Sequence, residues 1–231
     1  MKILAALVAA AALAGPCGAC TQQPAAGTYV TAGGWGKLKV QEDGAFSLEA
    51  VGTNGHHCGL EGRIVGGRAV LEELCVVSFT RQDGSVHVGP EGGADATRSA
   101  CRTYCGMRAD FEGVYRPELP ACSQEAVRSE RAAFLAEYQG RHFRSAAARL
   151  EKVLGTCGHF LWWMTEAEVR NDLALAQYRA GRRAACVQTL QPLAHLLKDQ
   201  PHYPPVEREW ADTLVPQLRF NWKMCAGELP S

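Results

Sequence analysis

Residues 37–48 read KLKVQEDGAFSL, and this stretch carries the pattern that predicts the structure of the first half of the chain. Apolar and polar side chains alternate over Lys37–Val40 and again over Phe46–Leu48, with the two-residue period of a half-buried β-strand. Between the two runs, Gln41–Gly44 is polar and ends in glycine, which is typical of a tight turn. The stretch therefore predicts two adjacent antiparallel strands.

The same pattern extends in both directions, from Gly27 to about Val114. Short β-branched runs such as Val76–Phe79 are separated by further turn signals, which are Asn54-Gly55, Gly66-Gly67 and Asp83-Gly84. Regular spacing of this kind predicts a small antiparallel barrel or sandwich over residues 27–121, and it argues against a parallel α/β sheet.

The period changes from two residues to that of a helix after Cys122. Ser123-Gln124-Glu125 has the composition of a helix start, and apolar residues then recur at helical spacing up to Tyr138. Four more helices are predicted over residues 144–154, 166–180, 184–198 and 205–224. The whole chain is therefore predicted to be α+β, with an α-helical domain over residues 122–231.

These predicted helices contain an internal repeat. Ala136-Glu137-Tyr138 recurs 40 residues later as Ala176-Gln177-Tyr178, and each copy has a glycine shortly after its tyrosine. The pattern resembles tetratricopeptide repeats in degenerate form, although its period is longer than the roughly 34 residues of that family. The resemblance implies packed helical hairpins whose inner face can hold a partner.

The N-terminus has the three regions of an export signal. Met1-Lys2 precedes an apolar run of 12 residues from Ile3 to Ala14, and small residues follow as far as Cys20. This run is shorter than the about 20 residues of a transmembrane helix, so we predict a signal peptide over residues 1–19 and a linker over 20–26. Cleavage could be ordinary, or Cys20 could carry a lipid, although Cys17 stands where lipoproteins usually have a leucine-like residue.

The ten cysteines leave an even set of eight once Cys17 and Cys20 are set aside, which predicts disulfides in an oxidising compartment. Counting outward from a two-residue turn at Gly66-Gly67 places Cys58 opposite Cys75, unless a bulge near Glu72 changes the register. Antiparallel helix stacking brings two further pairs together, and the β half allows three connectivities. The predicted set is Cys58–Cys75, Cys101–Cys105, Cys122–Cys157 and Cys186–Cys225.

Two groups of residues in the β half are candidates for function. His56 and His57 could bind zinc or act as acid and base, but neighbouring residues of a strand point to opposite faces, so they could equally just follow a turn. Tyr104 and Arg108 lie in the segment 101–115, rich in aromatic and charged residues, which could line a recognition groove. The alternative is that this segment is the last strand of the sheet with its disulfide anchor.

A third candidate lies in the helical half, where Arg170, Asn171 and Asp172 follow Trp162 and Trp163. These residues could form a solvated face beside a packed aromatic corner. They could also form the polar inner face of a helical repeat that binds a protein.

The composition and the motifs narrow the function classes. With 24 basic and 24 acidic residues and no basic run, the chain has no electrostatic feature that would attract nucleic acid or a membrane surface. Hydrolase, phosphate-loop, zinc-protease and dinucleotide motifs are absent from the sequence, so nothing in it calls for a cofactor or a catalytic residue.

Three segments carry a resemblance to a known family. They are NGHHC at Asn54–Cys58, CRTYCGMRADFEGVY at Cys101–Tyr115 and VRNDLA at Val169–Ala174. Together they look like an uncharacterised family of proteobacterial secreted proteins and lipoproteins. The resemblance implies export and a two-part layout, and it transfers no catalytic residue.

The style of the β half is similar to that of bacterial lysozyme inhibitors and periplasmic immunity proteins. We therefore expect a non-catalytic binding protein of the periplasm or envelope, with a protein partner such as a cell-wall-active enzyme. The alternatives are a periplasmic hydrolase that uses His56 and His57, or a metal carrier at the same two residues.

Overall fold

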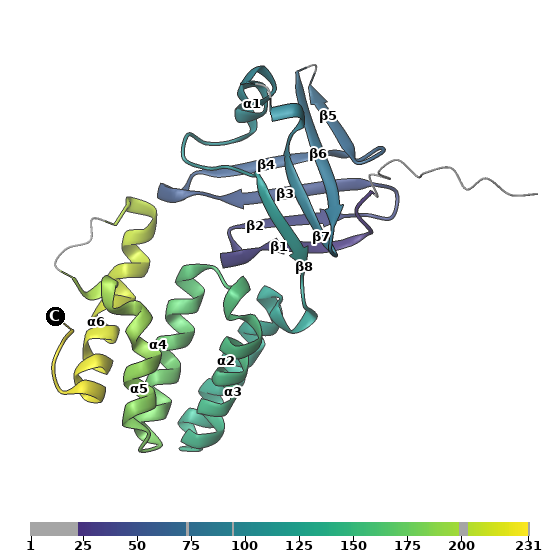
Figure 1. Ribbon diagram of the computed structural model, residues 1–231. Coiled ribbons are helices and arrows are strands. Elements are labelled where there is room, and N and C mark those ends of the chain that lie inside the picture. Colours follow the sequence, from purple (N-terminus) through teal and green to yellow (C-terminus); the bar gives the residue numbers. More distant parts are fainter. Residues whose placement is uncertain (1–22, 73, 94, 199–202, 231) are drawn as a thin grey trace, which may run out of the picture.

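The computed structural model describes residues 23–72, 74–93, 95–198 and 203–230 (Figure 1). It confirms the α+β class, because an eight-stranded antiparallel sheet curls toward a barrel and a stack of helices follows it. In the part of the chain that is described, no helix is both long and apolar enough to cross a membrane. The predicted signal peptide and Cys20 lie outside the described residues.

The sheet consists of two meanders joined by the last strand. Its order is β4-β3-β2-β1-β8-β7-β6-β5, so β8 comes last in the sequence but lies between β1 and β7. All of the strand pairings are antiparallel. The strands are β1 (Gly27–Thr31), β2 (Gly36–Val40), β3 (Ala45–Val51), β4 (His57–Arg63), β5 (Arg68–Glu72), β6 (Cys75–Gln82), β7 (Ser85–Pro90) and β8 (Gly113–Pro117).

The stretch that predicts the first hairpin forms β2 and β3. Leu38 pairs with Leu48 and Val40 with Phe46, and all four side chains are buried in the core of the sheet. The turn between them closes through a hydrogen bond from the Gly44 amide to the Gln41 carbonyl. Alternation therefore sends one face of this hairpin into the core and the other toward solvent.

The predicted pairing of the four cysteines in the β half is wrong. The structure joins Cys58 to Cys105 and Cys75 to Cys101, with Cα separations of 4.0 and 4.8 Å. The turn at Gly66-Gly67 does form, and Val65 bridges Arg68 as expected. Beyond this bridge, however, β4 and β5 separate and become the two edges of the sheet.

Cys75 is also not on the strand that follows the turn. β5 ends at Glu72 after a bulge, and Cys75 opens the next strand, β6, where it faces Glu72. A short helix α1 (Asp95–Cys101) and a 3-10 turn η4 (Arg102–Tyr104) pack on β6 and β4 and bring their cysteines to those strands. The alternative reading of residues 101–115 as the last strand is therefore wrong for its first part, because β8 begins only at Gly113.

The second half is a stack of α2 (Gln124–Gln139), α3 (Phe143–Cys157), α4 (Trp163–Arg179), α5 (Arg183–Leu190) and α6 (Pro205–Ala226). The side chain of Ser123 caps α2 by accepting a hydrogen bond from the Ala126 amide at 3.2 Å. The helix predicted over residues 184–198 is too long, because α5 ends at Leu190 and the chain continues as a 3-10 helix over Gln191–Leu197. Pro192 lacks the amide hydrogen that a continuing α-helix would need.

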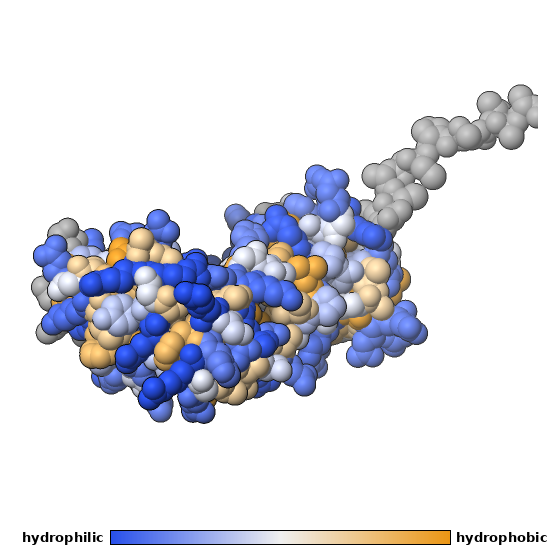
Figure 2. Space-filling model, turned by 90° about the horizontal axis from the view of Figure 1, so that it is seen from below, coloured by the Kyte–Doolittle hydropathy of each residue, from blue (hydrophilic) through white to orange (hydrophobic). Residues whose placement is uncertain are grey.

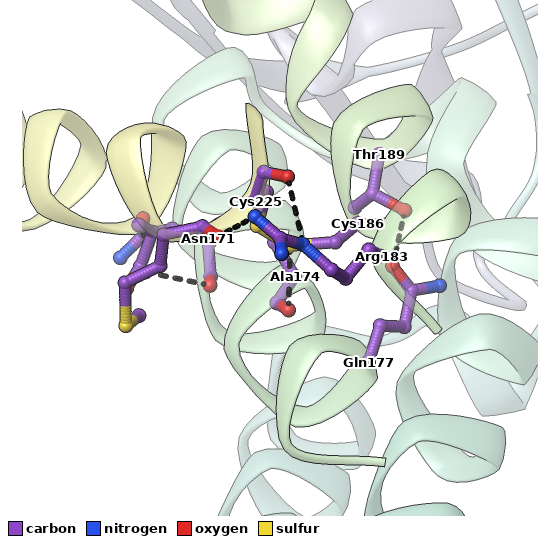
Figure 3. The surroundings of a disulfide bond; sticks show 9 residues. Asn171, Ala174, Gln177, Arg183, Cys186, Thr189 and Cys225 are labelled. Carbon is purple, nitrogen blue, oxygen red and sulfur yellow. Dashed lines mark hydrogen bonds between the residues drawn. A yellow bond between two sulfur atoms is a disulfide. The ribbon is translucent and has the colours of Figure 1, made fainter. Parts of the chain in front are cut away.

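Two disulfides close this stack, and both are the pairs that antiparallel stacking predicts. Cys122 joins Cys157 across α2 and α3, and Cys186 joins Cys225 across α5 and α6. Around the second of these, the Arg183 guanidinium donates a hydrogen bond to the carbonyl oxygen of Cys225 (Figure 3). The disulfides fit a protein that folds in an oxidising compartment.

The two parts touch at a contact that requires glycine. Gly34 has φ 64° and lies against the 3-10 turn η6 (Gly158–Phe160). A Cβ on Gly34 would clash with the carbonyl oxygen of Phe160 and lie 2.6 Å from the amide nitrogen of Trp162. Figure 2 shows the two parts side by side, and on the face in view hydrophilic side chains on both parts are interspersed with hydrophobic ones.

Candidate functional site

A cavity of about 380 Å³ lies where the sheet meets the helices. Strands β1 and β2 form one wall, while α2 and the start of α4 form the other. Its side chains include an ion pair between Lys37 and Glu118, at 3.1 Å, and the ring of Trp162. The lining residues are Val30, Gly34, Gly36, Lys37, Glu118, Cys122, Gln124, Val127, Arg128, Arg131, Phe160, Leu161, Trp162, Thr165 and Glu168.

A second cavity, of about 270 Å³, adjoins the first on the same side of the helices. It is lined from α2, α4 and α6 by Arg131, Glu168, Asp172, Trp210, Thr213, Leu214 and Gln217. Arg131 and Glu168 line both cavities. We call the two cavities together the inner groove.

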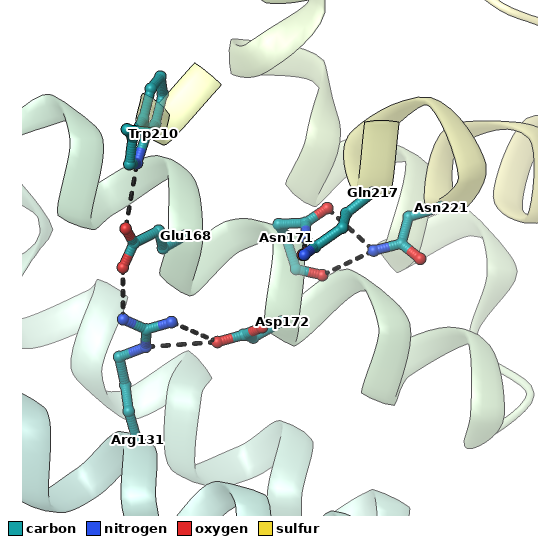
Figure 4. Close-up of polar contacts among 7 residues, drawn as sticks. All are labelled: Arg131, Glu168, Asn171, Asp172, Trp210, Gln217 and Asn221. Atoms are coloured by element: carbon teal, nitrogen blue, oxygen red, sulfur yellow. Dashed lines mark hydrogen bonds and ion pairs between the residues drawn. The ribbon is translucent and has the colours of Figure 1, made fainter. Parts of the chain in front are cut away.

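The inner groove is organised around Arg131 (Figure 4). Its guanidinium pairs with Glu168 at 2.5 Å and with Asp172 at 2.9 Å. The other oxygen of the Glu168 carboxylate accepts a hydrogen bond from the indole nitrogen of Trp210 at 3.0 Å. Three helices are therefore tied together by one polar network that faces the groove.

The network is only partly shielded from water, and two of its members, Arg131 and Asp172, have shifted pKa values. Burial raises the pKa of Asp172, with a smaller contribution from the nearby Glu168, and Arg131 opposes this. Burial alone would lower the pKa of Arg131, but Asp172 and Glu168 together outweigh it and raise that pKa. The charged form of Asp172 therefore depends on Arg131, whereas Arg131 has a second acidic partner.

Aromatic rings and one unpaired cation complete the surface. Trp163 packs edge-on against Trp210 at 4.8 Å between ring centroids, and Trp162 lies beside it in the first cavity. Arg128 is exposed at the same cavity, and among the residues that the structure describes it has no ion-pair partner. The groove thus offers ring faces, one free positive charge and several hydrogen-bonding groups.

The predicted residues of the helical half separate into different places. Asp172 and Trp162 line the inner groove, and Trp163 packs against Trp210, which also lines it. Arg170 instead pairs with Glu166, one helical turn earlier, at 2.7 Å. Asn171 is buried between α4 and α6, where the Asn221 amide donates to its side chain at 2.9 Å.

Most residues of the network are not marked by the sequence pattern. Glu168 lies four residues before Asp172 and therefore on the same face of the helix, so the spacing alone could have found it. Arg131 and Trp210 come from other helices, 41 and 38 residues away from Asp172, and no local pattern marks them.

The candidates of the β half gather in a separate, wide-open depression. It is lined by His56, His57, Tyr104 and Cys105 among others, but Cys105 is bonded to Cys58 and is not a free thiol. Within the described ranges, no group of three metal-ligating side chains comes together. Arg108 is exposed and does not line this depression. Its backbone carbonyl instead packs against Gly52.

Comparisons of the chain with protein-family models, curated proteins and solved structures found no match. Function is therefore inferred from the geometry of the inner groove. Because both parts of the chain contribute to its walls, the contact at Gly34 is also part of what shapes it.

Proposed function

We propose that this protein is an exported, non-catalytic binding protein of the periplasm or envelope whose inner groove holds an extended segment of a protein partner. The observation that carries the proposal is that two adjoining cavities, lined by both parts of the chain, meet at the Arg131–Glu168 ion pair. A row of linked cavities suits an extended chain better than a single compact ligand.

The side chains of the groove support a protein partner. Tryptophan and arginine are the residue types most enriched among the side chains that dominate binding energy at protein interfaces. Trp162 and Trp210 supply ring faces, while Arg128 can pair with an acidic side chain. The Arg131 network is already satisfied internally, so it shapes the groove without requiring a charged ligand.

The same residues support a non-catalytic role. Among the residues that the structure describes, the lining of the inner groove contains neither a histidine nor a free thiol, since Cys122 is bonded to Cys157. Its carboxylates are held by Arg131 and Lys37. We extend the proposal to the partner, which we take to be a cell-wall-degrading enzyme that this protein inhibits.

Site-specific crosslinking tests the groove. A photoreactive amino acid at Arg128, in protein made in the periplasm, should form a covalent adduct with a partner protein. The same amino acid at Lys152, an exposed residue of α3 outside the groove lining, should not. Trp162→Ala should reduce the adduct at Arg128. Equal crosslinking from both positions would contradict the proposal.

Inhibition of purified cell-wall-degrading enzymes then tests the partner. The alternative hydrolase would instead turn over a cell-wall or ester substrate and lose activity in His56→Ala or His57→Ala. The metal-carrier alternative requires at least one equivalent of bound metal in periplasmic protein, lost in the same two variants. Either of these results would contradict the proposal of a non-catalytic binding protein.

A further inference from the structure

Two turns at the far end of the helical part form a third surface. The α2–α3 and α4–α5 turns lie side by side there, away from the sheet (Figure 1). Between them is an open cavity of about 690 Å³ lined by Glu137, Arg141, His142, Phe143, Arg144, Ser145, Arg179 and Ala180. We call Arg141, Arg144 and Arg179 the arginine tip.

The three arginines differ from four others of the helical part, which are paired with acidic side chains. Arg131, Arg149, Arg170 and Arg182 all form ion pairs with glutamate or aspartate. In the described part of the chain, the guanidiniums of the arginine tip make neither an ion pair nor a hydrogen bond. Three unpaired cations therefore surround one cavity.

The single acidic side chain of this lining does not neutralise them. Glu137 pairs with Arg149 at 2.7 Å, and the hydrogen bond from that guanidinium lowers the pKa of Glu137. Its negative charge is thus already matched by an arginine outside the lining. The cavity keeps a local excess of positive charge in a chain whose formal net charge is zero.

The backbone of Arg141 adds an independent observation. Both turns end their helices in the same way, with the Arg141 amide donating to the Tyr138 carbonyl and the Gly181 amide to the Tyr178 carbonyl. Both residues have positive φ, 61° and 79°. Glycine is the usual residue at such a helix end because a side chain is strained there. The first turn nevertheless carries an arginine that lines the cavity.

We propose that the arginine tip binds phosphoryl groups, presented by the headgroups of an anionic phospholipid surface. Guanidinium groups match phosphate oxygens through paired hydrogen bonds. The open cavity at the end of the molecule is accessible to a flat surface, and its cations come from two separate turns, so they can engage several headgroups. The surface is separate from the inner groove, and the inference does not depend on the proposed function.

Vesicle co-sedimentation tests the inference. The purified disulfide-bonded protein, with Cys20→Ser so that no lipid can be attached, should bind vesicles of equal parts phosphatidylglycerol and phosphatidylcholine. It should not bind vesicles of phosphatidylcholine alone. Binding should weaken as salt rises above about 0.1 M, because the charges are then screened within about 10 Å. Arg144→Gln or Arg179→Gln should each weaken binding about fivefold.

Arg141→Gly separates loss of charge from loss of folding. This variant should weaken vesicle binding by a similar factor while raising the Tm by about 2 °C, because it relieves the positive φ. Arg81→Gln, the same loss of charge on the exposed face of β6, should change neither binding nor Tm appreciably.

Three results would overturn the inference. They are equal binding to the neutral vesicles, unchanged binding in Arg141→Gly, and binding of inorganic phosphate at the tip without any binding of vesicles. The last of these would show a site for free anions instead of a membrane surface.

Discussion

Replacing Arg131 by methionine should destabilise the protein far more than replacing its partner Asp172 by asparagine. Arg131→Met leaves two carboxylates facing each other without their shared cation, whereas Asp172→Asn leaves Arg131 paired with Glu168. Removing one partner of a fully buried ion pair costs about 3–5 kcal/mol, and an exposed pair contributes about 0–1 kcal/mol. The side chains here are 30–31% exposed. We therefore expect a loss of about 2 kcal/mol for Arg131→Met and under about 0.5 kcal/mol for Asp172→Asn.

Thermal unfolding followed by circular dichroism measures both effects. A loss of about 2 kcal/mol corresponds to a fall in Tm of about 4–8 °C for a chain of this size. The double variant should recover part of the loss of Arg131→Met, because it removes one of the two unpaired carboxylates.

The pH dependence provides a second, independent check. The pKa of Asp172 is raised in the folded protein, so its contribution to stability is present below the unfolded value and is lost as the pH rises through the folded value. Asp172→Asn should therefore gain stability relative to the parent as the pH rises above the ordinary carboxyl pKa of 3.8, and the deficit of Arg131→Met should grow in the same direction. Equal losses in the two single variants, or a deficit of Arg131→Met that does not change with pH, would refute this account of the network.

Two further predictions concern the connections between elements. Gly34→Ala should lower the free energy of unfolding by about 2 kcal/mol or more and weaken crosslinking from the inner groove, because the new Cβ meets the backbone of η6. Gly33→Ala is the matched control. Gly33 has φ 73° and its nearest side-chain neighbour lies at 3.9 Å, so this change should lower the free energy of unfolding by only about 1 kcal/mol, through backbone strain. Replacing Cys186 and Cys225 together by serine removes a disulfide between residues that are 39 apart in the sequence, and it should lower the free energy of unfolding by about 4 kcal/mol in denaturant titrations. A loss below about 1 kcal/mol would contradict the view that this disulfide stabilises the fold by restricting the unfolded chain.

The predictable parts of the fold are those that local pattern determines. The sequence predicts the alternation in β2 and β3 and the capping serine before α2 well, because each depends only on residues that are close together in the sequence. The helix–helix disulfides were also predictable, because antiparallel neighbours bring the start of one helix to the end of the next.

The unpredictable parts depend on where strands separate. Register counting through Gly66-Gly67 fails because β4 and β5 part after one bridge and because β5 is too short to reach Cys75. A sequence does not show that two strands joined by a turn will become the opposite edges of a sheet. The pairing of Cys58 and Cys75 with the two later cysteines follows only from that topology.

The candidate site shows the same division between local and long-range information. Asp172 and Trp162 are candidates from the sequence because they lie in, or directly before, a single helix, but Arg131, which organises the groove, comes from another helical hairpin. The charge count was equally uninformative about the arginine tip. The chain is neutral overall and has no basic run, so the local excess appears only when the two turns are folded against each other.

The internal repeat explains why the groove and the tip are distinct surfaces. Each copy of the repeat has a glycine shortly after its tyrosine, but Gly140 has φ −71° and the residue equivalent to Gly181 is Arg141. The repeat places its helix faces in the inner groove and its turns at the tip, and Arg128 and Arg141 are separated by about 20 Å along α2 and the turn that follows. Substitutions at the tip should therefore leave crosslinking from Arg128 unchanged, and Trp162→Ala should leave vesicle binding unchanged. If either substitution affected both measurements, the two surfaces would have to belong to one site, and the separate roles proposed for them would be wrong.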